Sequence, residues 1–432
     1  MSKKILKLRK KVAKKLASKS VHKIEDLKVS KNRSPERISP EVDKARAVAT
    51  YYGFSPLPDI SVEKEDIKLA KKFSESHLKT LHPFKDKNDR FGGFLEEKIS
   101  LLRNYSLKKF AGLGMPVMGH YIGPLKGNPH IKRTPDEETF NLEIIGGNKS
   151  IAEAMIIETA FVILKERYPG EELSVEINSV GDKEAIAKFV RELGNYCKKE
   201  LNNMGKLCRQ AVKRDIFALF HCSHDECSES QEGAPKPMSF LSESNRTHFK
   251  EVLEYLESLE IPYSVNHSLI GSRSYCTETI FEIKGNKNGV ETILAIGERY
   301  GGLAKKVWGK KDVPAIGTAL LIHPHFILKR RGIEKAAKPA KFFFIQFGFD
   351  AKLKSLALIE MLRQAKIPVY QSLSKDKLAA QLATAEKMNI PYIIIMGQQE
   401  AKDESVVVRK MDNHSQETVP MKELISYLKK LP

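Results

Sequence analysis

Residues 295–303 read AIGERYGGL, and the interpretation of the whole sequence starts from this stretch. An apolar run, GVETILAI (289–296), leads into it, and a basic segment with the chain's single tryptophan, AKKVWGK (304–310), follows it. Glycine supplies positive φ angles and lets a backbone come close to a bound group. The stretch therefore predicts a strand that ends in a turn shaped for a ligand.

Strand patterns lie on both sides of this turn, and a helical block separates them. Alternation and apolar runs predict strands near 115–125, 137–146, 173–181, 262–271, 277–285 and 290–296. A long apolar helix is expected at 151–168, and charged helices are expected near 182–203 and 243–259. This order predicts an α+β core over 43–326, with a largely antiparallel sheet and a helical insertion at about 180–260.

After residue 326 the sequence pattern changes from the α+β core to a linker and then to alternating strands and helices. A linker is expected at 327–340, and the segment 341–432 reads as a β-α-β-α-β-β-α series that opens with the core strand KFFFIQFG. We therefore predict a second, separate α/β domain of about ninety residues.

Bulk composition excludes several classes of protein. The chain has 432 residues and is 41% hydrophobic, which favours two to four globular domains. It has no run of about 18 apolar residues and no apolar signal segment, so we expect a cytoplasmic protein without a membrane partner. Five cysteines are an odd number for such a chain, which favours reduced thiols over disulfides.

Positive charge is concentrated at the amino end. Residues 1–40 carry 14 Lys or Arg and three Asp or Glu, so they supply +11 of the net +19. Apolar residues at helical spacing in 3–19 predict a cationic helix, followed by a linker that ends near residue 42. Such a helix favours RNA over a membrane surface, while a solvated tail is the plainer alternative. The expected RNA contacts are Lys3, Lys4, Lys7, Arg9, Lys10, Lys11, Lys14 and Lys15.

One cysteine cluster has two interpretations. Cys208, Cys222, His224 and Cys227 would make a Cys₃His zinc set. Their spacing fits no common zinc knuckle, so free thiols and no metal are the favoured reading, with zinc as the alternative.

The pieces together resemble the histidyl-tRNA synthetase family of class II aminoacyl-tRNA synthetases, over roughly residues 43–432. The resemblance rests on YYGFSPLP (51–58), GHYIGPL (119–125), NLEIIGG (141–147), EINSVGDKEA (176–185), LCRQAVKRDIFALFHC (207–222), YSVNHSLIGSRSYCTETIFEI (263–283), AIGERYGGL, VPAIGTALLI (313–322) and QLATAEKMNIPYIIIMGQQE (381–400).

This resemblance implies a class II antiparallel core, a carboxy-terminal anticodon-binding domain and a homodimer. It also implies a histidine and adenylate pocket made by Tyr275, Glu282, Gly297, Arg299, Tyr300, Gly301 and Gly302. Gln381, Gln398 and Glu400 would lie at the edge that faces the anticodon. The RNA partner is tRNA or another structured RNA, with the ribosome as a possible place of binding.

The chain departs from the family where arginines should stabilise the reacting phosphates. Gly127 and Gly271 stand at two of these places. The third motif, expected as the start of a helix, ends at Ile322, His323 and Pro324, and Leu95 replaces an arginine in an earlier block. No catalytic residue is therefore assigned. If activity is retained, Arg133, Arg273 and Glu97 would carry it, with ATP and Mg²⁺.

The leading hypothesis is a synthetase-like, RNA-binding pseudoenzyme that does not form adenylate. An active histidine–tRNA ligase with a divergent pocket is the first alternative. The regulatory subunit of a histidine-biosynthesis enzyme is the second, and it is disfavoured because such subunits generally lack the anticodon-binding domain.

Overall fold

The computed structural model describes residues 36–78, 95–113, 115–127, 138–222, 224–271, 275–309, 311–322, 327–329, 340–371 and 377–432. By contact density the chain divides into two units. The described part of the smaller one is an antiparallel pair, β1 (Glu36–Ile38) and β10 (Ile327–Lys329), within segments expected to be linkers. All other described elements belong to the larger unit.

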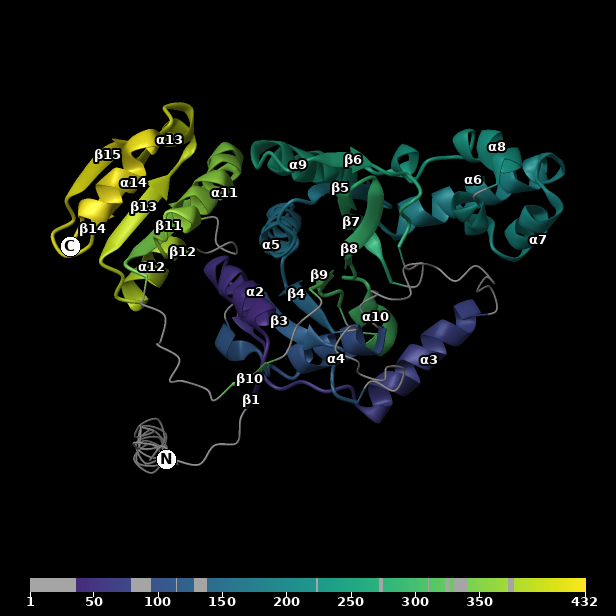
Figure 1. Ribbon diagram of the computed structural model, residues 1–432, viewed down its shortest axis with the longest axis horizontal. Helices are drawn as coiled ribbons and strands as arrows, with labels where there is room; N and C mark the ends of the chain where they lie inside the picture. Colours follow the sequence, from purple (N-terminus) through teal and green to yellow (C-terminus); the bar gives the residue numbers. More distant parts are fainter. Residues whose placement is uncertain are drawn as a thin grey trace, which may run out of the picture. The chain divides into compact units, whose positions relative to one another are not determined.

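The core of the larger unit is an eight-stranded sheet with the order β2-β3-β4-β9-β8-β7-β5-β6 (Figure 1). Only β2–β3 and β5–β6 are parallel pairs, so the predicted α+β core with a largely antiparallel sheet is confirmed. The strands are β2 (Ser55–Pro56), β3 (Val117–Gly123), β4 (Thr139–Ile145), β5 (Glu172–Ser179), β6 (Tyr263–Val265), β7 (Thr277–Lys287), β8 (Val290–Arg299) and β9 (Ala315–Leu321).

The segment 313–322 is a strand and not the start of a helix. β9 lies between β4 and β8, in the middle of the sheet, and six of its seven residues are buried. Both faces of this strand are covered, so its residues are apolar without alternation. The expectation of a helix here, which came from the family resemblance, was wrong.

Helix α5 (Ile151–Arg167) forms the centre of the core on one face of the sheet. Residues 151–164 are all buried, as expected of a helix that is apolar on every side. The helix packs against β9 and against α2 (Pro40–Tyr51) and α9 (Glu243–Ser258). The predicted long apolar helix is therefore present at its expected place.

Helix α4 (Leu95–Ser106) is more buried than its sequence suggests. Its sequence is strongly charged, yet residues 96–102 are all buried, including Glu96, Glu97 and Lys98. Its neighbour α3 (Lys64–Leu78) supplies Asp66, which accepts hydrogen bonds of 2.9 Å and 2.8 Å from the Arg103 guanidinium. Two cations of α4 are therefore neutralised by partners on other elements, Arg103 by Asp66 of α3 and Lys98 by Glu298 of β8.

A helical insertion follows β5 and has a small core of its own. It consists of α6 (Lys183–Glu200), α7 (Lys206–Arg214), α8 (Ser228–Glu232) and several 3-10 turns, and it leads into α9. Asp182 begins α6, because its Oδ1 accepts hydrogen bonds of 2.9 Å from the backbone amides of Glu184 and Ala185. The helical insertion predicted at about 180–260 is therefore found.

The carboxy-terminal region contains a five-stranded sheet with the order β12-β11-β13-β14-β15. A short helix, α13, and an edge strand, β15, were not predicted, because β15 is mostly exposed and carries little apolar signal. The elements are β11 (Phe342–Gln346), α11 (Phe349–Gln364), β12 (Val369–Gln371), α12 (Leu378–Lys387), β13 (Tyr392–Met396), α13 (Gln398–Lys402), β14 (Ser405–Lys410), β15 (Gln416–Pro420) and α14 (Met421–Lys430).

Two tyrosines of α2 and its C-cap donate hydrogen bonds to α11. The Tyr51 hydroxyl donates to the carbonyl oxygen of Ile367, just beyond α11, at 2.8 Å, and the Tyr52 hydroxyl donates to Glu360. Arg363 pairs with Glu360 at 2.6 Å and with Glu166 of α5 at 2.7 Å. Among the described helices none combines the length and apolarity needed to cross a bilayer.

Replacing Tyr52 by Phe should lower the free energy of unfolding by about 1–3 kcal/mol, because Glu360 loses a buried donor. Chemical denaturation of the full chain measures this. Tyr427→Phe is the matched control, since its hydroxyl donates to Glu417 at an exposed position, and it should change stability by less than about 0.5 kcal/mol. Equal effects of the two substitutions would contradict the assignment.

Candidate functional site

Two buried glutamates face each other across the centre of the sheet. In the strand register Glu143 of β4 lies beside Gly317 of β9, and Gly317 lies beside Glu298 of β8. A Cβ atom at Gly317 would lie 2.2 Å from the Glu143 carboxylate, so only glycine leaves room for it. We call Glu143 and Glu298 the carboxylate pair.

Lys98 of α4 reaches the carboxylate pair from above the sheet. Its Nζ forms an ion pair with Glu298 and lies 4.7 Å and 5.0 Å from the ring centroids of Tyr275 and Tyr300. Burial disfavours the ammonium, but the Glu298 carboxylate outweighs burial and raises the pKa of Lys98. The lysine is therefore a buried cation whose charge is already neutralised.

The pKa of Glu143 is shifted toward the protonated form. Burial raises its pKa to about 8, although the Tyr300 hydroxyl donates to its Oε2 at 2.7 Å and lowers the pKa in part. The carboxyl group is therefore largely protonated near neutral pH. It can donate a hydrogen bond, which a carboxylate cannot.

Arg299 occupies the opposite face of β8, next to the amino end of α5. Its Nε donates to Glu153 Oε1 at 2.8 Å, a second nitrogen binds the other oxygen of Glu153, and Nη1 donates to the carbonyl of Gly147 at 2.9 Å. His248 meets the same carboxylate at 2.7 Å. Burial opposes ionisation, yet Arg299 and His248 outweigh it and lower the pKa of Glu153 to about 2.

Packing explains two of the three glycines of the opening stretch, Gly297 and Gly301, and positive φ explains none of them. None of Gly297, Gly301 and Gly302 has a positive φ angle, so that expectation was wrong. A Cβ at Gly297 would lie 2.2 Å from the Phe281 ring, and one at Gly301 would lie 3.2 Å from the Pro314 backbone. Gly302 is the residue before α10 (Leu303–Trp308).

The other residues predicted for the pocket are buried as well. Tyr275 and Tyr300 contact Lys98, as described above, and Glu282 lies in β7, 4% exposed. Glu97 accepts a hydrogen bond of 2.7 Å from the backbone amide of Leu125. The Glu97 carboxylate therefore anchors the segment that follows β3.

Two of the positions where the family resemblance expects arginine have no room for one. Gly127 has a φ of +90°, and a Cβ there would lie 2.4 Å from the carbonyl oxygen of Val62. Gly271 has a φ of +66°, and its Cβ would lie 2.7 Å from Cys276 Sγ. Ile322 is 1% exposed and its carbonyl accepts from Arg167 at 2.9 Å. Arg133, Arg273, Ser274, His323 and Pro324 lie outside the described residues.

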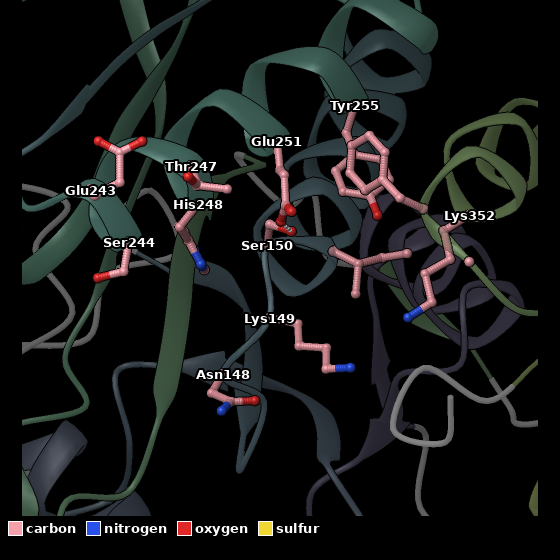
Figure 2. Close-up of a pocket in the computed structure, with 13 residues that line it drawn as sticks. Asn148, Lys149, Ser150, Glu243, Ser244, Thr247, His248, Glu251, Tyr255 and Lys352 are labelled. Atoms are coloured by element: carbon pink, nitrogen blue, oxygen red, sulfur yellow. Dashed lines mark hydrogen bonds between the residues drawn. The ribbon is translucent and has the colours of Figure 1, made fainter. Parts of the chain in front are cut away.

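A cavity lies away from these residues, beside the amino end of α5. It measures about 810 Å³ and is lined from 148–151, from α9 and from the start of α11 (Figure 2). Lys149 and Lys352 extend into it from different elements, and burial together with Lys149 lowers the pKa of Lys352. None of the pocket residues predicted from the sequence lines it.

The structure describes the expected RNA contacts of the carboxy-terminal domain but not those of the amino-terminal segment. The eight basic residues between Lys3 and Lys15 lie outside the described residues. Gln381 is fully buried, and its Nε2 donates to the carbonyl of Gln346 at 2.8 Å, so its placement on an RNA-facing surface was wrong. Gln398 is exposed at the start of α13, whereas Glu400 accepts a hydrogen bond of 2.9 Å from the Gly397 amide and fixes that helix start.

Among the residues that the structure describes, two groups of side chains have the composition of a cation site. In the first, formed by Glu153, His248 and Glu278, Arg299 already pairs with Glu153 and, at 3.0 Å, with Glu278, so a protein cation occupies the place of a metal ion. The second group is formed by Cys208, Cys222 and Cys227, with His224 beside it.

Comparison with known proteins agrees with this architecture. The family described as "Anticodon binding domain" matches residues 344–431. The histidine–tRNA ligase of Fervidobacterium nodosum is 30% identical over 381 residues, which is 86% of this chain and 90% of that protein. This chain belongs to the histidine–tRNA ligase family. Its fold is that of a class II synthetase core followed by an anticodon-binding domain.

Other relatives are similar at lower identity. The histidine–tRNA ligase of Halothermothrix orenii is 28% identical over 82% of this chain and 85% of that protein. Among solved structures, the apo S. aureus histidyl-tRNA synthetase has a TM-score of 0.44 at 22% identity, covering 93% of this chain and all of that one. A Bacillus halodurans protein described as an ATP phosphoribosyltransferase regulatory subunit/histidyl-tRNA synthetase has a TM-score of 0.41 at 15% identity, covering 86% and 98%.

Sequence reasoning missed Lys98, Glu143, Glu153 and Glu298 in this family member. Glu143 in NLEIIGG and Glu153 in IAEAMII were visible as charged residues within apolar stretches, whereas Lys98 follows two glutamates and gives no such signal. A charge is rarely buried unless it is paired, so Glu143 and Glu153 signalled buried partners.

Glu143→Gln tests the protonated carboxyl. Because the folded state keeps a proton that the unfolded state releases above about pH 4.5, the wild type should lose about 3 kcal/mol of unfolding free energy between pH 5 and 8 from this group. The Gln variant, which keeps an acceptor for Tyr300, should not show that loss. Denaturation curves of both proteins across this range give the difference, and parallel pH dependences would refute the raised pKa.

Proposed function

We propose that this histidine–tRNA ligase family member binds tRNA, or another structured RNA, and forms histidyl adenylate at a negligible rate. The observation that carries the proposal is the backbone at Gly127. There a positive φ and the Val62 carbonyl exclude any side chain from a place where the family resemblance expects a phosphate-binding arginine.

The surroundings of Gly127 hold this backbone in place. The Val62 amide donates to the carbonyl of Lys126 at 2.9 Å, and Glu97 accepts from the amide of Leu125. The two residues that precede Gly127 are therefore anchored by hydrogen bonds to other elements, which supports the position of the backbone at Gly127. Gly271 is similarly enclosed by the side chains of Cys276 and Ile280.

The absence of phosphate-binding arginines should slow adenylate formation strongly. One preorganised group that stabilises a reacting phosphate contributes roughly 3–4 kcal/mol, or two to three decades in rate. Gly127 and Gly271 stand where two such groups are expected, and the third motif, which should end in an arginine, ends at Ile322, His323 and Pro324. The residues at these places therefore do not fit the polyphosphate of ATP with Mg²⁺.

An active ligase is the second candidate, and the relationship to proteins named histidine–tRNA ligase over 86% of the chain favours it. Arg133 and Arg273 would then have to supply the missing charge, with Glu97 beside them. The buried Lys98 is a poor substitute, because Glu298 already neutralises it and a lysine lacks the bidentate geometry of a guanidinium.

Retention of the anticodon-binding domain supports the RNA-binding part of the proposal. Gln398 is the exposed candidate for a contact to a base edge, and the basic residues of 1–40 would bind phosphates. The proposal also includes a homodimer and a cytoplasmic location. The ribosome is one place where the protein would bind RNA.

Histidine-dependent exchange between ATP and pyrophosphate measures adenylate formation directly. We expect a rate at the level of a control without histidine, at least about 10³-fold below that of the Fervidobacterium nodosum relative assayed in parallel. Exchange within tenfold of the relative would establish the active ligase instead.

RNA affinity should depend on the basic amino-terminal residues. Replacing the eight predicted contacts by Gln should weaken tRNA binding at low salt and flatten its salt dependence, because fewer counterions are released. Fluorescence anisotropy at several salt concentrations measures both. Lys188→Gln with Lys250→Gln, at exposed positions of α6 and α9, is the control and should leave the slope unchanged. An unchanged slope in the eightfold variant would assign binding to the rest of the chain.

A further inference from the structure

We propose that Cys208, Cys222, Cys227 and His224 bind one structural zinc ion in the helical insertion. Four ligands of these types are the usual composition of a closed zinc site, which supports folding and leaves no position open for catalysis. This site is independent of the proposed function.

The ligand atoms are already close to one another. The three sulfur atoms lie within 4.8 Å of each other, and Cys208 Sγ is 3.0 Å from Cys222 Sγ. His224 Nδ1 lies 3.3 Å from the sulfur atoms of both Cys208 and Cys222. Around a zinc ion with Zn–S near 2.3 Å, tetrahedral geometry places neighbouring sulfur atoms about 3.8 Å apart, so small movements of the side chains would suffice.

A disulfide does not account for this arrangement. The five cysteines are free, and the separation of Cys208 and Cys222 exceeds a bonded S–S distance of about 2.05 Å. Three neighbouring thiols with an imidazole beside two of them, and no covalent bond, are better explained by a shared metal ion. On binding, the thiols would release their protons to solvent and no electron would be transferred.

The backbone around the cluster supports its geometry. Cys208 lies in the first turn of α7, while Cys222 and Cys227 end two successive 3-10 turns. Gln231 Nε2 donates to the carbonyls of Leu219 at 2.8 Å and Cys222 at 2.5 Å, which fixes the turn that carries Cys222. Such outer contacts orient metal ligands in known zinc sites.

Burial is graded across the cluster. Cys208 and Cys227 are buried, Cys222 is half-buried and His224 is exposed. The sulfur atoms therefore face the interior of the insertion, and the histidine side gives a metal ion access from solvent.

A metal ion that joins separate segments would also stabilise the helical insertion. The stretch from 206 to 240 is made of short helices and 3-10 turns around a small core, which by itself can bury little apolar surface. A metal joining Cys208 to Cys222, which are 14 residues apart, would restrict the unfolded chain. Sequence spacing disfavoured zinc because the ligands come from separate elements that only the fold brings together.

The test begins with the metal content of the full chain, produced without a polyhistidine tag in medium that contains zinc and iron. Elemental analysis by mass spectrometry should find about one zinc per chain, as a closed site binds one ion. Cys208→Ser and Cys222→Ser should lose the metal, whereas Cys197→Ser, a buried cysteine of the same core outside the ligand set, should keep it.

A second measurement does not depend on whether the variants fold. Cobalt(II) added to the metal-free wild type should give the visible absorption bands of tetrahedral thiolate coordination, and zinc should displace them stoichiometrically. Metal removal should lower the melting temperature, with recovery on addition of zinc but not magnesium. Wild-type protein with less than about a tenth of a zinc per chain and no such cobalt bands would overturn the proposal, and stoichiometric iron would overturn the choice of metal.

Discussion

Two consecutive residues of β8 tie together the layers of the core. Glu298 and Arg299 point to opposite faces of the sheet, as neighbours in a strand must. Glu298 pairs with Lys98 of α4 on one face, and Arg299 pairs with Glu153 of α5 on the other. Both ion pairs are buried, and removing one partner of such a pair typically costs about 3–5 kcal/mol. The strand thus holds a helix on each side.

Several polar groups of the predicted pocket have partners within the protein. Arg299 was expected beside a ligand, but three of its hydrogen bonds go to Glu153 and Gly147. Tyr300 donates to Glu143, and Glu97 accepts from Leu125. The polar groups that a substrate would use are engaged within the protein, and at Gly127 and Gly271 the backbone excludes the side chains that would replace them. We infer that the scaffold of the family persists here with its phosphate-binding function lost.

Much of the fold could be predicted from the sequence because its signals are local. The apolar run at 151–164 required a buried helix, and the apolar strand FFFIQ at 342–346 required a covered sheet. The site could be predicted only in part, because it depends on contacts between distant residues. The burial of Lys98 follows from Glu298, 200 residues away, and that of Gln381 from the Gln346 carbonyl. The cysteine cluster has the same origin, since its ligands come from three separate elements.

The central claim is that the pocket no longer accommodates an acyl-phosphate intermediate. A non-hydrolysable sulfamoyl analogue of histidyl adenylate, titrated into the purified chain by calorimetry, tests this without any dependence on turnover. We predict no saturable heat above that of dilution, because Gly127 and Gly271 leave the phosphate position without their guanidinium groups. Saturable binding at one site per chain with submicromolar affinity, of the order of −8 kcal/mol or stronger, would contradict the account.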